Sequence, residues 1–312
     1  MRIIERLKKP GHAMAGLLRR LWFLFPNDRL YVSLIYRLES GKKLDLNNPQ
    51  LFTEKIQWLK LYDHNKDYTS MVDKISAKEY VSVRIGEKYV IPTLGTWNHF
   101  DEIDFEKLPD RFVLKTNHGG GGNAVVLCKG QKSLNKSMAK NVLERSLRRN
   151  GYWAYREWPY KNIVPKIFAE QLIQLSEKES DDIVDYKFFC FDGEPKYCQV
   201  IQDRHVKETI DFFDMEWNHQ EFVGLNPGIT NASSLPARPK HFEEMKRVTE
   251  KLSEGMPFVR IDLYDTGEKV YFGEITFYPA SGLGAFSPSE YDLKLGNMIQ
   301  LPKLKKFDEK SL

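Results

Sequence analysis

Four consecutive glycines lie between two short apolar segments in "RFVLKTNHGGGGNAVVL", residues 111–127, and follow Lys115. An ordered glycine costs roughly 0.5–1 kcal/mol relative to alanine, because it loses more backbone entropy on folding. A tight hairpin turn repays that cost, and so does a loop whose bare amides approach an anion. The pattern therefore predicts strand, loop and strand beside a cation. It is not a P-loop, since no GK[ST] follows, and the chain lacks the HRD and DFG motifs of protein kinases.

The composition is that of a folded protein with room for several subdomains. The 312 residues are 41% hydrophobic and 13% aromatic, which excludes a disordered chain. The three cysteines show no CxxC spacing, and the seven histidines form no HExxH pair, so we expect reduced thiols and no zinc site. No apolar run approaches the roughly 20 residues that span a bilayer, and no signal-peptide layout is present, so we expect a cytoplasmic protein.

Positive charge is concentrated at the N-terminus. Residues 1–43 carry ten Lys and Arg against three acidic residues, whereas the remainder has a slight excess of acid. Apolar residues recur there at helical spacing, at Leu17, Leu18, Leu21, Trp22 and Phe25. A basic amphipathic helix suits peripheral contact with an anionic membrane, and the alternative is a helix packed on its own domain with a solvated charged face. The stretch has no nucleic-acid-binding motif, so we expect no nucleic-acid partner.

The rest of the chain predicts an α+β fold with at least two sheets. Helices are expected over residues 47–80, with Thr53 as a plausible N-cap, and over 135–150 and 239–253. Strands are expected over 89–97 and 163–173. Two antiparallel hairpins then follow, turning at "DGEP" and "DTGE".

Two groups of side chains have the chemistry of a nucleotide site. Glu170, inside the apolar "FAEQLI", could accept the amino group of adenine, or could be a satisfied acid at a strand end. Lys187 in "DYKFF" and Arg204 in "QDR" lie on strands expected to pair. If both side chains point to the same face of the sheet, they would add positive charge near bound phosphates. The alternative is that both are exposed charges on the strands.

A pair of acids in the last hairpin is the most specific feature. Asp262 in "VRIDL" and Glu274 in "FGEITFYPASG" are at the centres of facing apolar strands, where an unpaired carboxylate costs several kcal/mol. Magnesium shared between such carboxylates and substrate phosphates would neutralise them. Arg260 shares the face of Asp262, because strand side chains alternate with period two. The alternative is a buried ion network of these three side chains.

The order of these motifs resembles that of ATP-grasp enzymes, from about Asp73 to Pro288. More narrowly, the chain resembles the TupA-like branch, which is linked to teichuronopeptide and surface-polysaccharide synthesis. The matching segments are "FTEKIQWLKLYD", "DK" at 73–74, "IGEKYVIPTLG", "LPDRFVLKTNHGGGG", "DYKFFCFDG" and "GEITFYPASG". The resemblance implies an ATP-grasp fold in four parts. These are a basic helical extension (1–46), an N-terminal helical or α+β subdomain (47–110), a lid subdomain with the glycine-rich loop (111–173) and a C-terminal subdomain with the magnesium-binding strands (174–312).

The resemblance also implies roles for individual residues. ATP would be bound by Lys115, Lys187, the loop glycines Gly119, Gly120, Gly121 and Gly122, and, around adenine, Glu170, Gln171, Leu172 and Ile173. Lys74 would be a further phosphate contact, or a lysine in a helical stretch that pairs with an acid. Mg²⁺ would be bound by Asp262, Glu274 and Thr276, where most members carry asparagine at the third place. Charge on the transferred phosphoryl group would be stabilised by Lys187, Arg204 and Arg260.

The implied activity is ATP-dependent ligation of a carboxylate to an amine through an acyl phosphate, with ADP released. The TupA-like resemblance points to a uronic-acid carboxylate of a sugar or glycan and to an amino acid as the amine, in capsular or surface-polysaccharide synthesis. Ser281, Gly282 and Gly284 would line the substrate pocket, and the aromatic residues of 151–162 would either stack on a sugar or pack beneath the lid helix. Alternatives are a sugar kinase, a glycosyltransferase-like enzyme and a catalytically silent nucleotide-binding scaffold.

Overall fold

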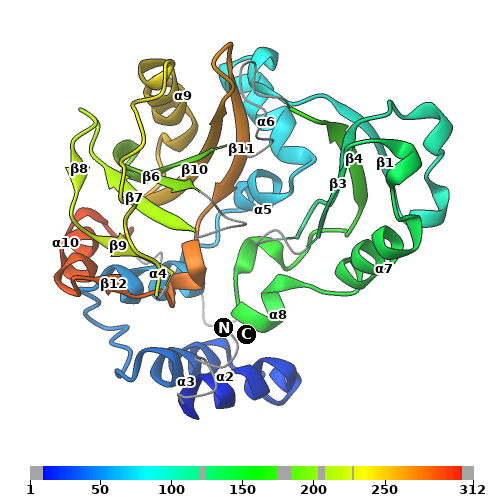
Figure 1. Ribbon diagram of the computed structural model, residues 1–312. Helices are drawn as coiled ribbons and strands as arrows, with labels where there is room; N and C mark the ends of the chain where they lie inside the picture. The colour runs from blue at the N-terminus through cyan, green and yellow to red at the C-terminus, as the bar shows by residue number, and fades with distance from the viewer. Residues whose placement is uncertain (1–9, 120–123, 174–183, 203–207, 227, 304–312) are drawn as a thin grey trace.

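The computed structural model describes residues 10–119, 124–173, 184–202, 208–226 and 228–303 (Figure 1). The helical elements are α2 (Pro10–Arg20), η1 (Trp22–Leu24), α3 (Asp28–Ser40), α4 (Phe52–Tyr62), α5 (Asp67–Val72), α6 (Ser76–Ile85), η2 (Glu87–Tyr89), η3 (Phe100–Glu102), η4 (Phe105–Lys107), η5 (Gln131–Ser133), α7 (Lys136–Leu147), α8 (Gly151–Tyr155), η6 (Trp158–Tyr160), α9 (Phe242–Ser253), η7 (Pro279–Gly282) and α10 (Glu290–Met298). The strands are β1 (Thr93–Trp97), β2 (Phe112–Thr116), β3 (Val125–Cys128), β4 (Ile167–Gln171), β5 (Asp185–Phe191), β6 (Glu194–Gln202), β7 (Thr209–Phe213), β8 (His219–Gln220), β9 (Val223–Gly224), β10 (Phe258–Asp265), β11 (Val270–Thr276) and β12 (Phe286–Ser287).

Two antiparallel sheets organise the molecule, which confirms the expected α+β class. The smaller has the order β1-β4-β2-β3 and the larger the order β11-β10-β5-β6-β7-β8, and β12 pairs with β9 in a short third sheet. Figure 1 shows the two main sheets on opposite sides of the molecule, with α5 and α6 between them. Helix α7 packs on β2 and β3, and α9 packs on β5, β6 and β10.

Two hydrophobic cores correspond to these two sheets, and their residues come from both sides of the expected subdomain boundaries. One core joins buried residues of α7 to the smaller sheet and to η3. The other core combines buried residues of the helices α3, α4, α5 and α6 with those of the larger sheet. The segment before β1 therefore shares a core with the C-terminal half of the chain. A boundary between residues 110 and 111 would also separate β1 from its partner β4. The smaller sheet thus takes a strand from each side of that point, and the division there stays a prediction.

The hairpin turns follow from local chemistry. Asp192 and Gly193 link β5 to β6 with φ values of 51° and 79°. A two-residue turn with positive φ at both positions matches the twist of the paired strands, and Asp-Gly suits it. The β10–β11 hairpin likewise turns at Gly267, with φ of 82°. Both turns lie where the sequence predicts them.

The start of α4 differs from the prediction. The N-cap is Leu51, and Thr53 lies inside the first turn. The backbone N–H and the hydroxyl of Thr53 donate to the two carboxylate oxygens of Asp292 in α10, each at 2.9 Å. A helix N-terminus has unpaired N–H groups, and here a carboxylate 239 residues away satisfies one of them. That partner comes from tertiary packing, so local sequence could not predict it.

The N-terminal extension packs against the segment that contains α8. Trp22 stacks on Trp153 with ring centroids 4.3 Å apart. Arg156, which is buried, donates to the carbonyls of Trp22 and Phe25 and forms an ion pair with Asp28 at 2.7 Å. The aromatic stretch 151–162 therefore packs in part against the extension. None of the helices in the described ranges is long and apolar enough to cross a bilayer.

Candidate functional site

Three predicted site residues form one row across the larger sheet. Asp262 in β10 lies directly opposite Lys187 in β5 on one side and Glu274 in β11 on the other. Directly opposite residues on neighbouring strands place their side chains on the same face, about 4.5–5.5 Å apart. The sequence-based expectation that the two acids face each other is thus met by the strand register.

Asp262 is buried, with 3% of its surface exposed, and two cations balance its charge. Arg260 donates from Nε to Oδ1 at 2.7 Å and from Nη2 to Oδ2 at 2.9 Å, and Lys187 Nζ forms an ion pair with Oδ2. Burial acts to raise the pKa of Asp262, but Arg260 and Lys187 outweigh it and hold that pKa below its ordinary value. The sequence argument supposed that a buried Asp262 needs Mg²⁺ to neutralise it. Because two protein cations already do so, its burial alone does not require a metal ion.

Glu274 has a different environment. Its side chain is 26% exposed, with Lys74 Nζ at 3.9 Å from Oε1. The Thr276 hydroxyl donates to the same oxygen at 3.3 Å and accepts from Arg260 Nη2 at 3.1 Å. Glu274 is thus partly exposed, whereas Asp262 beside it is buried with both oxygens paired to cations.

These oxygens fit Mg²⁺ with a substrate phosphate. Within the described ranges no group of three or more His, Cys, Asp or Glu residues could hold a metal ion. Magnesium usually takes one or two carboxylates, together with waters and substrate phosphates, so two acids suffice. Asp262 and Glu274 would supply the protein oxygens, with the Thr276 hydroxyl adjacent.

Lys74 joins this row to the start of the glycine loop. It lies in the turn between α5 and α6, outside both helices, and its Nζ donates to the carbonyl of Gly119 at 2.6 Å. Its backbone N–H donates to the carbonyl of Asn117 at 3.0 Å. Lys74 is therefore a cation between Gly119 and Glu274. The remaining predicted loop residues, Gly120, Gly121 and Gly122, lie outside the described residues, as does Arg204.

A second cluster surrounds Glu170. Lys115 forms an ion pair with its Oε1, and Lys78 in α6 contacts Oε2 at 3.1 Å. Burial acts to raise the pKa of Glu170, but Lys115 and Lys78 lower it overall. Sequence reasoning missed Lys78. Its Nζ also donates to the carbonyl of Ile91 at 2.8 Å.

The backbone after Glu170, which is predicted to contact adenine, is already hydrogen-bonded in part within the protein. The N–H of Gln171 donates to the carbonyl of Pro92 at 3.0 Å. Leu172 and Ile173 follow the end of β4, and both are partly buried. Of the three residues expected to read the adenine edge, Gln171 already uses its backbone donor within the protein.

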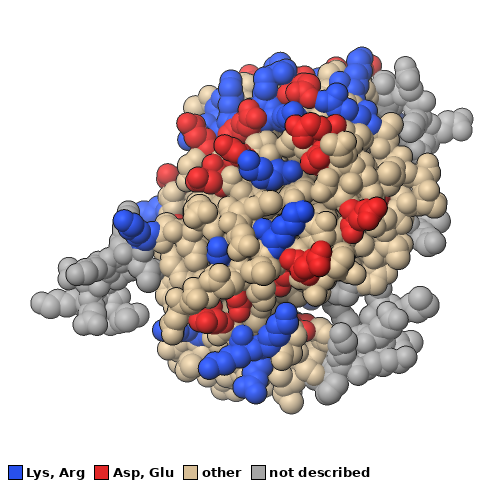
Figure 2. Space-filling model, turned by 90° about the vertical axis from the view of Figure 1, so that its left-hand side faces the viewer, with Lys and Arg blue, Asp and Glu red and all other residues tan. Residues whose placement is uncertain are grey.

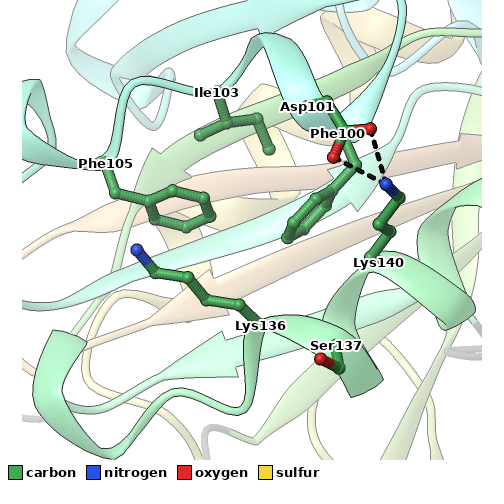
Figure 3. A pocket seen from close by; sticks show the side chains of 7 residues that line it. All are labelled: Phe100, Asp101, Ile103, Phe105, Lys136, Ser137 and Lys140. Atoms are coloured by element: carbon green, nitrogen blue, oxygen red, sulfur yellow. Dashed lines mark hydrogen bonds and ion pairs between the residues drawn. The ribbon is translucent and has the colours of Figure 1, made fainter.

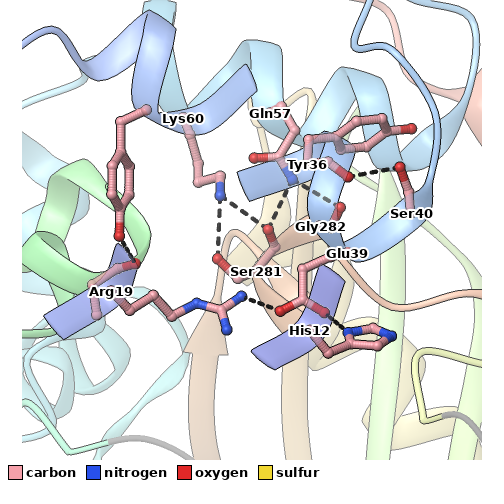
Figure 4. Close-up of polar contacts among 11 residues, drawn as sticks. His12, Arg19, Tyr36, Glu39, Ser40, Gln57, Lys60, Ser281 and Gly282 are labelled. Carbon is pink, nitrogen blue, oxygen red and sulfur yellow. Dashed lines mark hydrogen bonds and ion pairs between the residues drawn. The ribbon is translucent and has the colours of Figure 1, made fainter. Parts of the chain in front are cut away.

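The predicted substrate segment is hydrogen-bonded by side chains of α4 (Figure 4). Lys60 Nζ donates to the Ser281 carbonyl at 2.9 Å and to its hydroxyl at 3.1 Å, and Gln57 Nε2 donates to the carbonyls of Ser281 and Gly282. Ala280, Ser281 and Gly282 all have positive φ, from 47° to 63°. Three successive left-handed residues are costly, and such backbone strain is concentrated at functional sites.

The two glycines of this segment serve packing. A Cβ on Gly282 would lie 2.6 Å from Ile56 Cγ2, and a Cβ on Gly284 would lie 2.5 Å from the Leu225 Cα. The close neighbours of both glycines are therefore protein atoms. Whether Ser281, Gly282 and Gly284 contact substrate stays a prediction.

Lys60 and Glu157 are titratable groups that sequence reasoning missed. Burial lowers the pKa of Lys60 to about 7, with Glu157 opposing the shift. Burial also raises the pKa of Glu157, whose nearest opposing charge is Lys60 and which senses Glu274 as a like charge. The only sequence signal for Lys60 was its place in "FTEKIQWLKLYD", one of the segments that resembles the TupA-like branch.

A hollow of about 340 Å³ lies apart from these residues, between η3, η4 and α7 (Figure 3). None of the predicted site residues lines it. Its two lysines are engaged: Lys140 contacts both carboxylate oxygens of Asp101, at 2.7 and 2.5 Å, and Lys136 lies 4.2 Å from the ring centroid of Phe105. The charges that could hold a phosphate are therefore in the row around Asp262 and not here.

Solved structures of ATP-grasp ligases are among those similar to this chain. The D-alanine–D-alanine ligase from Bacillus anthracis has 15% identity and a TM-score of 0.39, over 67% of this chain and 58% of that one. The D-alanine–D-alanine ligase from Helicobacter pylori has 14% identity and a TM-score of 0.39, over 80% and 69%. The ATP-grasp ligase PsnB in complex with minimal precursor, Mg and ADP has 11% identity and a TM-score of 0.37, over 72% and 57%. At these TM-scores the likenesses add nothing to a functional argument.

The family match is more extensive. No curated protein matches the sequence. The family model described as TupA-like ATPgrasp matches residues 54–300, which include every described residue of the Asp262 row, Lys74, the Glu170 cluster and the 279–282 turn. The match covers well over half of the chain, and the chain therefore belongs to the TupA-like ATP-grasp family.

Proposed function

We propose that this protein is an ATP-dependent carboxylate–amine ligase that joins an amino acid to the uronic-acid carboxylate of a sugar or glycan in surface-polysaccharide synthesis. The observation that supports this most directly is the row of Lys187, Asp262 and Glu274, with Lys74 between Glu274 and Gly119, inside a TupA-like ATP-grasp match. Cations and oxygen ligands for a triphosphate thus lie together. The uronic acid and the amino acid rest on the family resemblance.

The reaction proceeds in two transfers. A carboxylate oxygen of the acid attacks the γ-phosphorus of ATP, and the bond from that phosphorus to the β–γ bridging oxygen breaks. ADP departs, and the acid becomes an acyl phosphate. The amine then attacks the acyl carbon, inorganic phosphate leaves with the C–O electron pair, and the amine loses a proton. Bound Mg²⁺ supplies charge neutralisation for the phosphates.

The protein's own part is positioning and charge. Lys187 and Arg260 lie beside Asp262, where they can balance negative charge that moves from ATP to the acyl phosphate. Loss of one such charge partner typically costs about 2.7–4 kcal/mol, or roughly 10²–10³ in rate. Lys115 and Lys78 hold Glu170 ionised at the adenine side. In this proposal Lys74, Lys115 and Lys187 are phosphate contacts.

The test is a matrix of uronic-acid nucleotides and glycans against amino acids, with ADP and the mass of the amide as readouts. ADP release that requires both acid and amine is expected. Glu274→Gln should lose it, whereas Glu268→Gln, an exposed acid in the same hairpin, should keep it. ADP formed with a sugar and no amine would indicate a kinase, and sugar transfer without ATP a glycosyltransferase. ATP binding with no ADP from any pair would indicate a silent scaffold.

A further inference from the structure

The N-terminal helices leave an unusual share of the exposed apolar surface. Six of the fifteen large apolar side chains that are exposed among the described residues lie between residues 14 and 34, and these are Met14, Leu17, Phe23, Leu24, Leu30 and Leu34. Phe23 and Leu24, next to each other in η1, are 60% and 59% exposed. Scattered apolar side chains are normal on a surface, but a concentration of them indicates an interaction site.

These exposed side chains do not result from a helix without packing partners. The opposite side of α3 is buried, with Tyr31, Val32, Ile35 and Tyr36 in the main core. The extension is thus attached through one side of α3, and Leu30 and Leu34 of the same helix are exposed.

The charge of the extension is equally one-sided. The two described acids of α2 and α3 are both in ion pairs: Glu39 with Arg19 at 2.6 Å and with His12, and Asp28 with Arg156. Figure 4 includes the pairing of Glu39. No ion pair within the described ranges involves the three exposed arginines of α2 and α3, which are Arg20, Arg29 and Arg37. At the lower end of the face in Figure 2, at the height of α2 and α3, basic side chains predominate.

We propose that the exposed residues of α2, η1 and α3 form a docking surface for an anionic lipid bilayer. Arginine beside exposed leucine and phenylalanine is the combination that an interfacial helix uses, because the cations meet lipid phosphates while the apolar side chains enter the acyl boundary. A second copy of the chain fits less well. An isologous contact would bring the same uncompensated arginines together. The inference is independent of the ligase chemistry.

Deletion of residues 1–43 is a poor test, because it would uncover the core residues that contact Tyr31 and Val32. Point variants on the exposed side avoid that problem. We would measure co-sedimentation of the full chain with vesicles of phosphatidylcholine alone and of phosphatidylcholine mixed with phosphatidylglycerol. The variants are F23S/L24S for the apolar part and R20E/R37E for the charge. The matched control is Val83→Ser in α6, whose side chain is 82% exposed.

Binding to the phosphatidylglycerol vesicles and not to the neutral ones is expected, with weaker binding as salt rises. F23S/L24S and R20E/R37E should each reduce the affinity at least about tenfold, with unchanged thermal unfolding, because each removes two contacts at the interface. Val83→Ser should bind as the parent protein does. Absence of binding to anionic vesicles, or equal binding by F23S/L24S, would overturn the proposal. A concentration-dependent dimer that F23S/L24S abolishes would overturn it in favour of a second copy.

Discussion

Asp262→Asn and Glu274→Gln should differ greatly in their cost to the free energy of unfolding, although each removes one candidate oxygen ligand. Asn at 262 takes the closest counter-charge from Arg260 and Lys187, whose side chains are only 14% and 10% exposed, and leaves Lys187 with Asp185 at 3.7 Å. Breaking a buried ion pair by removing one partner typically costs about 3–5 kcal/mol, because the remaining charge is buried and uncompensated. Asp262→Asn should therefore lower the free energy of unfolding by that amount.

Glu274→Gln should lower the free energy of unfolding much less. Its side chain is 26% exposed, its nearest ion-pair partner is Lys74 at 3.9 Å, and a glutamine can still accept from Thr276. Partly exposed pairs of this length contribute at most about 1 kcal/mol. This variant should fold as the parent does and yet lose the stabilisation that Mg²⁺ and ATP confer, which grows with ligand concentration relative to Kd.

The assay is urea unfolding of the parent and both variants, with and without Mg²⁺ and ATP. The pH dependence adds a second readout. Because the pKa of Asp262 is held below its ordinary value, its contribution is complete above about pH 4 and is lost as the pH falls through the lower folded-state pKa. The difference between the parent and Asp262→Asn should shrink accordingly. An Asp262→Asn protein as stable as the parent at pH 7 would refute the reasoning. So would a Glu274→Gln protein that Mg²⁺ and ATP stabilise as fully as the parent.

Three further predictions concern the supports of the site. Gly282→Ala should destabilise by about 1–3 kcal/mol in thermal unfolding, because φ is +63° and the new Cβ meets Ile56, whereas Gly16→Ala in the open face of α2 should stabilise by roughly 0.5–1 kcal/mol. Equal effects would contradict the geometry. Arg156→Ala should cost at least about 2 kcal/mol in urea unfolding, since it removes the side-chain donor to the Phe25 carbonyl and the ion pair with Asp28, and a change under about 0.5 kcal/mol would argue that the extension is loosely held. The folded-state pKa of Lys60 is about 7, below that of the unfolded chain, so the unfolded chain binds more protons between about pH 7 and 10. The parent should therefore gain stability relative to Lys60→Met as the pH rises through this window, and a flat difference would show that Lys60 stays charged.

Much of the site could be predicted from sequence because it depends on short-range geometry. Arg260 and Asp262 contact each other since strand residues two apart share a face. The Asp-Gly and Thr-Gly turns define where the hairpins reverse, and the hairpin connecting β10 to β11 brings Asp262 opposite Glu274. The order of these motifs was enough to indicate the ATP-grasp family.

Only the tertiary structure decided how the charges are partnered. Lys78 reaches Glu170 across 92 residues, Lys60 reaches Ser281 across 221, and Lys74 reaches Gly119 across 45. Each of these lysines comes from the helical segment before β1, and no local pattern specifies the acceptor of a helix lysine. The choice depends on how that helix packs against two sheets. For the same reason the sequence could place Arg260 on the face of Asp262, but only the packed sheet shows that Lys187 supplies the second cation.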